Sequence, residues 1–223
     1  MKSQHLEEGL GEGFNLVDYV AAQRLTTQIC QELAHSLTPG VYEEEAHELF
    51  KTLLKKHGLA KVWHPTKIRF GVNTLCNFRE LGEPQQRLHE GELFFVDIGP
   101  IVNGHEGDYG ETYRCGGGGD ALITASRDVF NLTQKAWQEQ KRTGPALYEV
   151  AKRACIERGY KLNMQMDGHR LGDFPHHLHF KGDLATFNHV PIPGVWVLEI
   201  HVIDEQRQRG AFYEDILGLS QMN

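Results

Sequence analysis

Five short segments place an acidic residue or a histidine at a strand position or beside a glycine. They are Asp97 in FFVDIGP, Asp108 in HEGDYGET, His169 in DGHRLG, Glu199 in VLEIH and Glu214 in FYEDIL. A carboxylate with apolar neighbours on both sides is costly to bury unless its charge is paired or bound to a metal. Several carboxylates brought together would repel one another, and divalent cations with an imidazole in their shell relieve that repulsion.

These carboxylate and imidazole donors limit which metals could bind and which reaction the site could catalyse. Carboxylate oxygens with one nitrogen suit Mn, Co, Fe or Zn better than a metal that prefers thiolates. Two such ions about 3.5 to 4 Å apart can share a water, lower its pKa and stabilise the tetrahedral intermediate of amide hydrolysis. We therefore expect a hydrolase site with two divalent ions. The four cysteines form no CxxC or CxH pair, which favours free thiols over a zinc ribbon or a redox motif.

The composition is that of an ordinary globular domain. Of the 223 residues, 40% are hydrophobic and 24% are charged, which suits one core with a built-in duplication. The net charge of −7 and the lack of long basic runs argue against a nucleic-acid partner. The sequence has neither a secretory signal nor an apolar run long enough for a membrane helix. We expect a cytoplasmic protein with an N-terminal tail at residues 1–13 and one catalytic domain at residues 14–223.

Hydrophobic periodicity predicts four helices. The first runs from Phe14 to about Ala34, and its apolar face is expected to hold Val17, Ala21, Leu25, Ile29 and Leu33. The second helix begins near Tyr42 and stops at His57-Gly58, with Glu43 to Glu45 as a solvated acidic first turn. The other two are predicted at Leu122 to Gln140 and at Pro145 to Arg158.

Strands are predicted between and after the helix pairs. Short segments rich in Val, Ile, Phe and Trp lie at Val62-Trp63 and at Ile68 to Val72. A hairpin is expected from Leu93–Ile98 and Tyr109–Cys115, which would carry one aspartate on each arm. Two helices, strands, two helices and more strands indicate an α+β fold of two similar halves around one antiparallel sheet.

These motifs resemble the pita-bread metallopeptidases, which include methionine aminopeptidases, Xaa-Pro aminopeptidases, prolidases and creatinases. The resemblance covers Asp18 to Leu219 and rests on LTPGVYEEEAHEL, LHEGELFFVDIG, GHRLG, LEI after PIPGVW, and YEDIL, in family order. It implies the pita-bread fold, in which helices related by a pseudo-twofold axis pack on a curved antiparallel sheet. It also implies two divalent ions, with Mn expected first and Co, Fe or Zn as alternatives.

The resemblance also implies roles for single residues. Asp97, Asp108 and Glu214 would bind one metal or bridge two, with Asp108 and Glu214 as the bridging pair, and His169 and Glu199 would complete the second site. His176, seven residues after His169, would polarise the substrate carbonyl, and Glu199 would also carry a proton. The family places a further histidine about five residues after Asn73, where this sequence has Asn77 and Phe78. His64 or His105 could enter the site in its place.

The sequence therefore predicts a hydrolase that cleaves an amide bond of a small peptide, as an aminopeptidase or an Xaa-Pro peptidase. Two alternatives stay open. A non-peptide amidohydrolase of the creatinase type would explain the missing histidine and the altered segment from Arg170 to His177. A peptidase-fold binding protein without activity is the other. The expected partner is a small peptide or amide, neither nucleic acid nor membrane is expected, and a homodimer is a fair expectation for a protein of this size.

Overall fold

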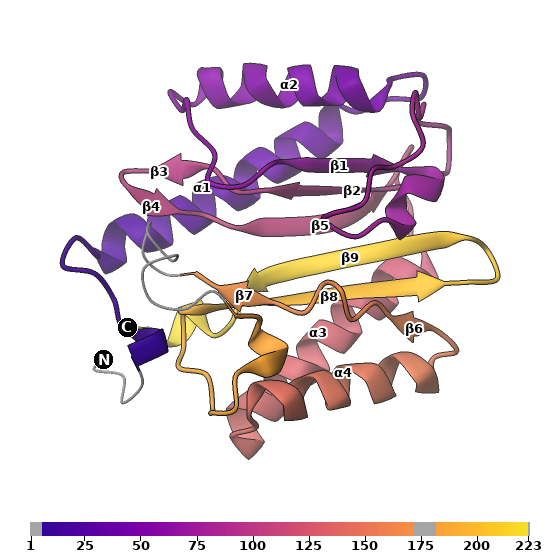
Figure 1. The fold of residues 1–223 in the computed structure, drawn as a ribbon. Helices are drawn as coiled ribbons and strands as arrows, with labels where there is room; N and C mark the ends of the chain where they lie inside the picture. Colours follow the sequence, from indigo (N-terminus) through magenta and orange to yellow (C-terminus); the bar gives the residue numbers. More distant parts are fainter. Residues whose placement is uncertain (1–5, 172–181, 223) are drawn as a thin grey trace.

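The computed structural model describes residues 6–171 and 182–222 and shows two halves of similar construction (Figure 1). The first half contains α1 (Leu16–Ser36), α2 (Glu43–Lys56), β1 (Lys67–Phe70), β2 (Leu93–Ile98), β3 (Ile101–Val102), β4 (His105–Glu106) and β5 (Tyr109–Arg114). The second half contains α3 (Ala121–Gln140), α4 (Gly144–Glu157), β6 (Lys161–Leu162), β7 (His169–Arg170), β8 (Trp196–Asp204) and β9 (Arg209–Ile216). Short 3-10 helices are η1 (Leu6–Glu8), η2 (Gly71–Leu75), η4 (Leu184–Thr186) and η5 (Leu219–Gln221).

The order of the strands confirms the expected duplication. The main sheet runs β1-β2-β5-β9-β8-β6 and its pairings are antiparallel, with β7 attached to β8. Read from either edge inward, each half contributes an edge strand, the outer arm of a hairpin and its inner arm. The two inner arms, β5 and β9, pair only at Gly110↔Glu214 and Glu111↔Tyr213. The pseudo-twofold axis therefore passes through this short contact.

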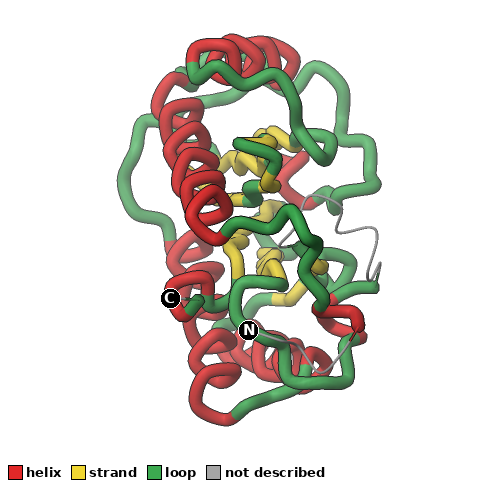
Figure 2. The backbone as a smooth tube through the Cα atoms, turned by 90° about the vertical axis from the view of Figure 1, so that its left-hand side faces the viewer, coloured by secondary structure: helices red, strands yellow, loops and turns green. Residues whose placement is uncertain are grey.

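Two hydrophobic cores hold the helices on the sheet. One joins α3 and α4 to β8, and the other joins α1 and α2 to β1 and β2. Figure 2 shows the strands between these helices on one side and connecting loops on the other. This layering leaves the face of the sheet away from the helices for the loops and for the acidic side chains.

The buried face of α1 differs from the prediction. Val17 is 78% exposed, whereas Tyr19 is fully buried, and the polar Gln23 and Thr26 are buried as well. The expected apolar face is therefore wrong for the first two turns. The reason is that Tyr19 packs in an apolar cluster with Leu171, Val197 and Ile216, whereas Gln23 supplies hydrogen bonds to the loop backbone at Asp108.

Three other local predictions also need correction. Val62 forms only an isolated bridge with Pro100, so Val62-Trp63 is no strand. The strand predicted at Ile68 to Val72 ends at Phe70, because Gly71, with φ of 52°, begins η2. Glu43 is buried and accepts hydrogen bonds from the Phe70 N–H and the Asn73 side chain, so it is not a solvated helix start.

Residues before α1 contact the second half of the domain. The Glu8 carboxylate is buried and accepts hydrogen bonds from the Trp196 indole N–H and the Ile192 N–H, both at 2.8 Å. The buried Arg170 guanidinium donates to the carbonyls of Glu7 and Gly9. The side chain that follows His169 thus holds the N-terminal segment and does not line the cavity described below. Among the described residues, no helix is both long enough and apolar enough to cross a membrane.

His201 on β8 is held in its neutral form. Its Nε2–H donates to the Thr74 carbonyl at 2.8 Å, and its Nδ1 lies 3.2 Å from the Asn163 side-chain nitrogen, which has only hydrogens to offer. Burial lowers the pKa of His201 to about 4. Protonation would place two donors against each other in the core.

We predict that His201 makes the metal-free protein sensitive to acid. The unfolded chain takes up a proton at His201 below its ordinary pKa of about 6.5, and the folded chain does so only near pH 4, so stability falls as the pH drops through this window. In the wild type, His201 should lower the free energy of unfolding by up to about 3 kcal/mol across this pH window, and replacing His201 with Gln should remove that loss. Urea unfolding in EDTA at pH 7 and pH 4.5 measures it. Equal pH dependence in both proteins would contradict the assignment.

Candidate metal centre

Three acidic positions and a glycine form a row across the centre of the sheet. Asp97 on β2 pairs with Gly110 on β5, Gly110 pairs with Glu214 on β9, and Glu214 pairs with Glu199 on β8. Residues directly opposite one another in antiparallel strands share a face of the sheet. Asp108 lies two residues before Gly110 and so faces the same side. The pseudo-twofold arrangement therefore brings carboxylates from both halves to one place.

Gly110 leaves the space that this row needs. A Cβ at position 110 would lie 2.6 Å from Oε1 of Glu214 and 2.5 Å from the Phe212 ring. Any other residue would push the Glu214 carboxylate away from the axis. The glycine is thus part of the site although it offers no donor.

The first turns of α1 position Asp108. The Gln23 side chain accepts from the Asp108 N–H at 2.8 Å and donates to the Asp108 carbonyl at 2.6 Å and to the Asp215 carboxylate at 2.8 Å. The helix approaches so closely that a Cβ on Gly107 would lie 1.9 Å from Oγ1 of Thr26. Gln23 is a positioning residue that the sequence reading missed, since a glutamine in a helix has no pattern of its own.

The second half supplies His169 and Glu199. Nε2 of His169 lies 3.1 Å from Oδ2 of Asp108 and 3.9 Å from Oε1 of Glu199. The other oxygen of Glu199 accepts from the Gly168 N–H at 2.9 Å. Gly168 has φ of 71°, and a Cβ there would lie 2.5 Å from the Val197 carbonyl, so a glycine is required at this turn.

All five residues expected from the sequence line one cavity of about 200 Å³. The rest of its wall includes Trp63, His64, Phe78 and Arg79. His105 is not among the described residues that line it, because its ring is fixed by the Asn15 N–H and the Asn103 carbonyl. His176 lies outside the residues that the structure describes.

Three of the carboxylates in the cavity, those of Asp97, Asp108 and Glu214, are buried. Burial raises the pKa of Asp97 to about 7, and burial with the charges of Asp108 and Asp97 raises the pKa of Glu214 well above its usual range. Burial opposes the charge of Asp108 too, but contacts with His169 and His64 lower its pKa to about 2. For His169, burial opposes protonation, and contact with Asp108 raises its pKa to about 10 nevertheless. Protons and imidazolium charges thus offset the carboxylates in the metal-free chain.

The residues fit divalent cations. The described residues contain two groups of ligands, and within each group the ligand atoms all lie within 4.8 Å of one another. One group is formed by His64, Asp97 and Asp108, and the other by Asp108, His169 and Glu214. Three buried atoms in the cavity form no hydrogen bond with any described residue, namely Nε2 of His64, Oδ2 of Asp108 and Oε1 of Glu214. Buried polar atoms normally have partners, and atoms that coordinate a metal are a common exception.

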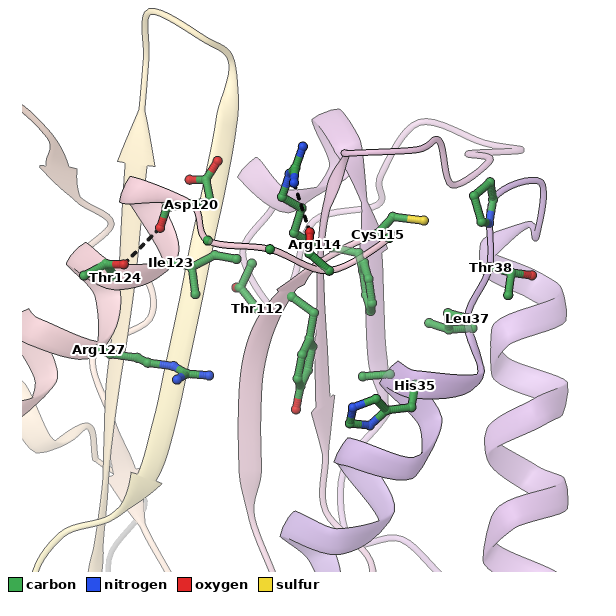
Figure 3. A pocket seen from close by; sticks show the side chains of 18 of the residues that line it. His35, Leu37, Thr38, Thr112, Arg114, Cys115, Asp120, Ile123, Thr124 and Arg127 are labelled. Carbon is green, nitrogen blue, oxygen red and sulfur yellow. Dashed lines mark hydrogen bonds between the residues drawn. The ribbon is translucent and has the colours of Figure 1, made fainter.

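A larger cavity of about 750 Å³ lies elsewhere, between α1, α3 and the loop of Gly116 to Gly119 (Figure 3). Three of its charged side chains have partners within the described structure. Arg127 pairs with Glu111, Arg114 donates to the Gly117 carbonyl, and Asp120 caps α3. None of the five expected residues lines it, so the smaller cavity is the candidate site.

Comparison with known proteins places the chain in a family. A family model described as metallopeptidase family M24 matches residues 18–218. The chain belongs to metallopeptidase family M24. This confirms the family resemblance seen in the sequence, whereas none of the curated proteins compared with the chain matches it significantly.

Solved structures confirm the pita-bread fold of this M24 chain. A prolidase from Pyrococcus horikoshii superposes with a TM-score of 0.74 at 19% identity, over 95% of this chain and 60% of the prolidase. An X-Pro aminopeptidase from Thermotoga maritima gives 0.74 at 16% identity, over 96% and 61% of the two chains. A methionine aminopeptidase from the same organism gives 0.68 at 17% identity, over 89% and 90%. The M24 chain thus spans about three fifths of the first two proteins.

We predict that Gly110→Ala weakens metal binding, because the added methyl would displace the Glu214 carboxylate. Gly119→Ala is the matched control, since a Cβ there meets nothing within 4 Å. Calorimetric titration with Mn²⁺ should give an affinity at least about 10-fold weaker for Gly110→Ala and an unchanged affinity for Gly119→Ala. Equal affinities in both variants would show that the close contact at Gly110 does not matter for the site.

Proposed function

We propose that this M24 chain is a hydrolase that cleaves an amide bond of a small peptide with two divalent metal ions. The observation that carries the proposal is the convergence of Asp97, Asp108, His169, Glu199 and Glu214 on one buried cavity. Relatives in structure include a prolidase, an X-Pro aminopeptidase and a methionine aminopeptidase. Aminopeptidase or Xaa-Pro peptidase action is therefore the activity to test first.

The carboxylates would hold the ions. Asp97 and Asp108 belong to the first half, and Glu214 lies on β9 beside the axis. His169 and Glu199 also come from the second half. When bound, two divalent ions supply Lewis acidity and a water of lowered pKa. Mn²⁺ suits a site of mostly carboxylate oxygens and is our first choice, with Co, Fe or Zn as alternatives.

Glu199 would move a proton during the reaction. Its side chain is 14% exposed, against 5% for Asp97 and 2% for Asp108, so it reaches the open part of the cavity. The Gly168 N–H donates to one oxygen and so fixes the carboxylate, whose remaining lone pairs would serve the ion and the transferred proton. Burial raises the pKa of Glu199, which favours its taking up a proton. His176 would polarise the substrate carbonyl.

A second candidate is an amidohydrolase for non-peptide amides. Phe78 lines the cavity at the place where the resemblance implies a histidine, and the ring of Phe78 offers no hydrogen bond to a peptide. Small cyclic amides and amidines therefore belong in the same assay.

We predict that Asp108→Ala abolishes hydrolysis. Asp108 contacts both His64 and His169, so its loss removes a donor from both candidate metal positions. Turnover of Met-Ala and Xaa-Pro peptides with added Mn²⁺ should fall more than about 100-fold. Asp128→Ala, an exposed position on α3, should match the wild type.

The other possible results of this assay distinguish the proposed function from its alternatives. Unchanged turnover in Asp108→Ala would refute the site. Metal binding by the wild type with turnover of non-peptide amides alone would favour the second candidate. Neither metal binding nor hydrolysis of any amide would favour a binding protein that uses the peptidase fold.

A further inference from the structure

His64 lies in the candidate centre although the family resemblance assigns no ligand at its position. It belongs to the segment before β1 and is 9% exposed. Its Nε2 lies 3.4 Å from Oδ1 of Asp108 and 3.6 Å from Oδ1 of Asp97. Sequence reasoning offered it only as one of two alternatives for a missing histidine.

These distances fit two ligands of one ion better than a direct hydrogen bond. Protein N–H···O hydrogen bonds span about 2.7 to 3.2 Å, and Nε2 of His64 forms none with the described residues. Two donors each about 2.1 Å from one ion, at angles of 90 to 120°, lie about 3.0 to 3.6 Å apart. The distances from Nε2 of His64 to Oδ1 of Asp108 and to Oδ1 of Asp97 fall in this range, and the ligand atoms of all three residues lie within 4.8 Å of one another.

The ring is oriented as a metal ligand requires. Nδ1 of His64 lies 3.1 Å from the Pro65 carbonyl, and a carbonyl oxygen only accepts, so Nδ1 carries a hydrogen. In the neutral ring this leaves a lone pair on Nε2, directed at two carboxylates. Histidine ligands commonly donate their other ring nitrogen to a backbone carbonyl in this way.

The backbone around His64 is built to keep the ring there. The Trp63 N–H donates to the Gly99 carbonyl, and the Trp63 indole donates to the Gly107 carbonyl, both at 2.9 Å. A Cβ on Gly99 would lie 2.2 Å from the His64 ring, so only a glycine at the end of β2 admits it. The two hydrogen bonds of Trp63, to Gly99 after Asp97 and to Gly107 before Asp108, thus hold the segment that carries His64.

We propose that His64 binds, through Nε2, the metal ion held by Asp97 and Asp108. Oδ1 of Asp108 faces His64 and Oδ2 faces His169. Asp108 then lies between two positions that each receive one imidazole. A neutral nitrogen adds a donor without adding to the crowded negative charge. This inference rests on the proposed metal centre but not on any substrate.

The test compares wild type with His64→Gln, which keeps the size of the side chain, and with His64→Ala. His89→Ala is the control because it removes an exposed histidine that does not line the cavity. Calorimetric titration of each metal-free protein with Co²⁺ gives the number and affinity of sites. Proton NMR of the Co²⁺-loaded proteins detects the shifted ring N–H of each histidine bound to the ion. Far-UV circular dichroism establishes that each variant is folded.

We expect two Co²⁺ ions per wild-type chain. Both His64 variants should bind one ion as the wild type does and the other at least about 10-fold more weakly, and they should lose one shifted ring N–H signal. Wild-type affinities and signals in folded His64→Gln would overturn the ligand role while leaving the proposed function intact. The ligand role would also be overturned if the His64 variants bound both Co²⁺ ions equally more weakly and kept every shifted ring N–H signal of the wild type. Failure of the wild type to bind Co²⁺ would remove the metal centre itself.

Discussion

The structure depends on one electrostatic constraint, the burial of several carboxylates at the axis between two similar halves. Asp97, Glu214 and Glu199 lie in one register row that crosses four strands, and Asp108 reaches the same place just before β5. Such a cluster is stable only when positive charge compensates the carboxylates or protons neutralise them. In the metal-free chain, the imidazoles and raised carboxyl pKa values supply that compensation, and divalent ions would supply it more fully.

The same constraint explains features that look unfavourable when each is considered alone. Gly110 and Gly168 lack side chains because carboxylate and backbone groups occupy the space beside them. Gln23 and Thr26 interrupt the apolar face of α1 because they pack against the backbone around Asp108. The short β5–β9 pairing continues through the Thr112 hydroxyl, which accepts from the Phe212 N–H and donates to the Phe212 carbonyl. These locally unfavourable residues position the carboxylates of the candidate metal centre.

The sequence predicted the parts of the fold that have strong periodicity and the residues with distinctive flanks. The four helices, the hairpin with its two aspartates, the α+β class and the M24 resemblance are confirmed. The five candidate ligands meet in one cavity, and their roles as metal ligands stay a prediction. The buried face of α1 could not be predicted, because its partners, an apolar cluster of the second half and the backbone of Asp108, are distant in sequence. His64 could not be separated from His105, since only the tertiary fold decides which ring reaches Asp108.

Anomalous diffraction from Mn²⁺-soaked crystals tests the central claim most directly, because it locates ions without requiring a substrate. We expect two anomalous peaks in the cavity, one beside Asp97 and Asp108 and the other beside His169 and Glu199, with Glu214 between them. An ordered cavity without any peak at saturating Mn²⁺ would contradict the account and leave the row of carboxylates to be stabilised by protons and imidazoles alone.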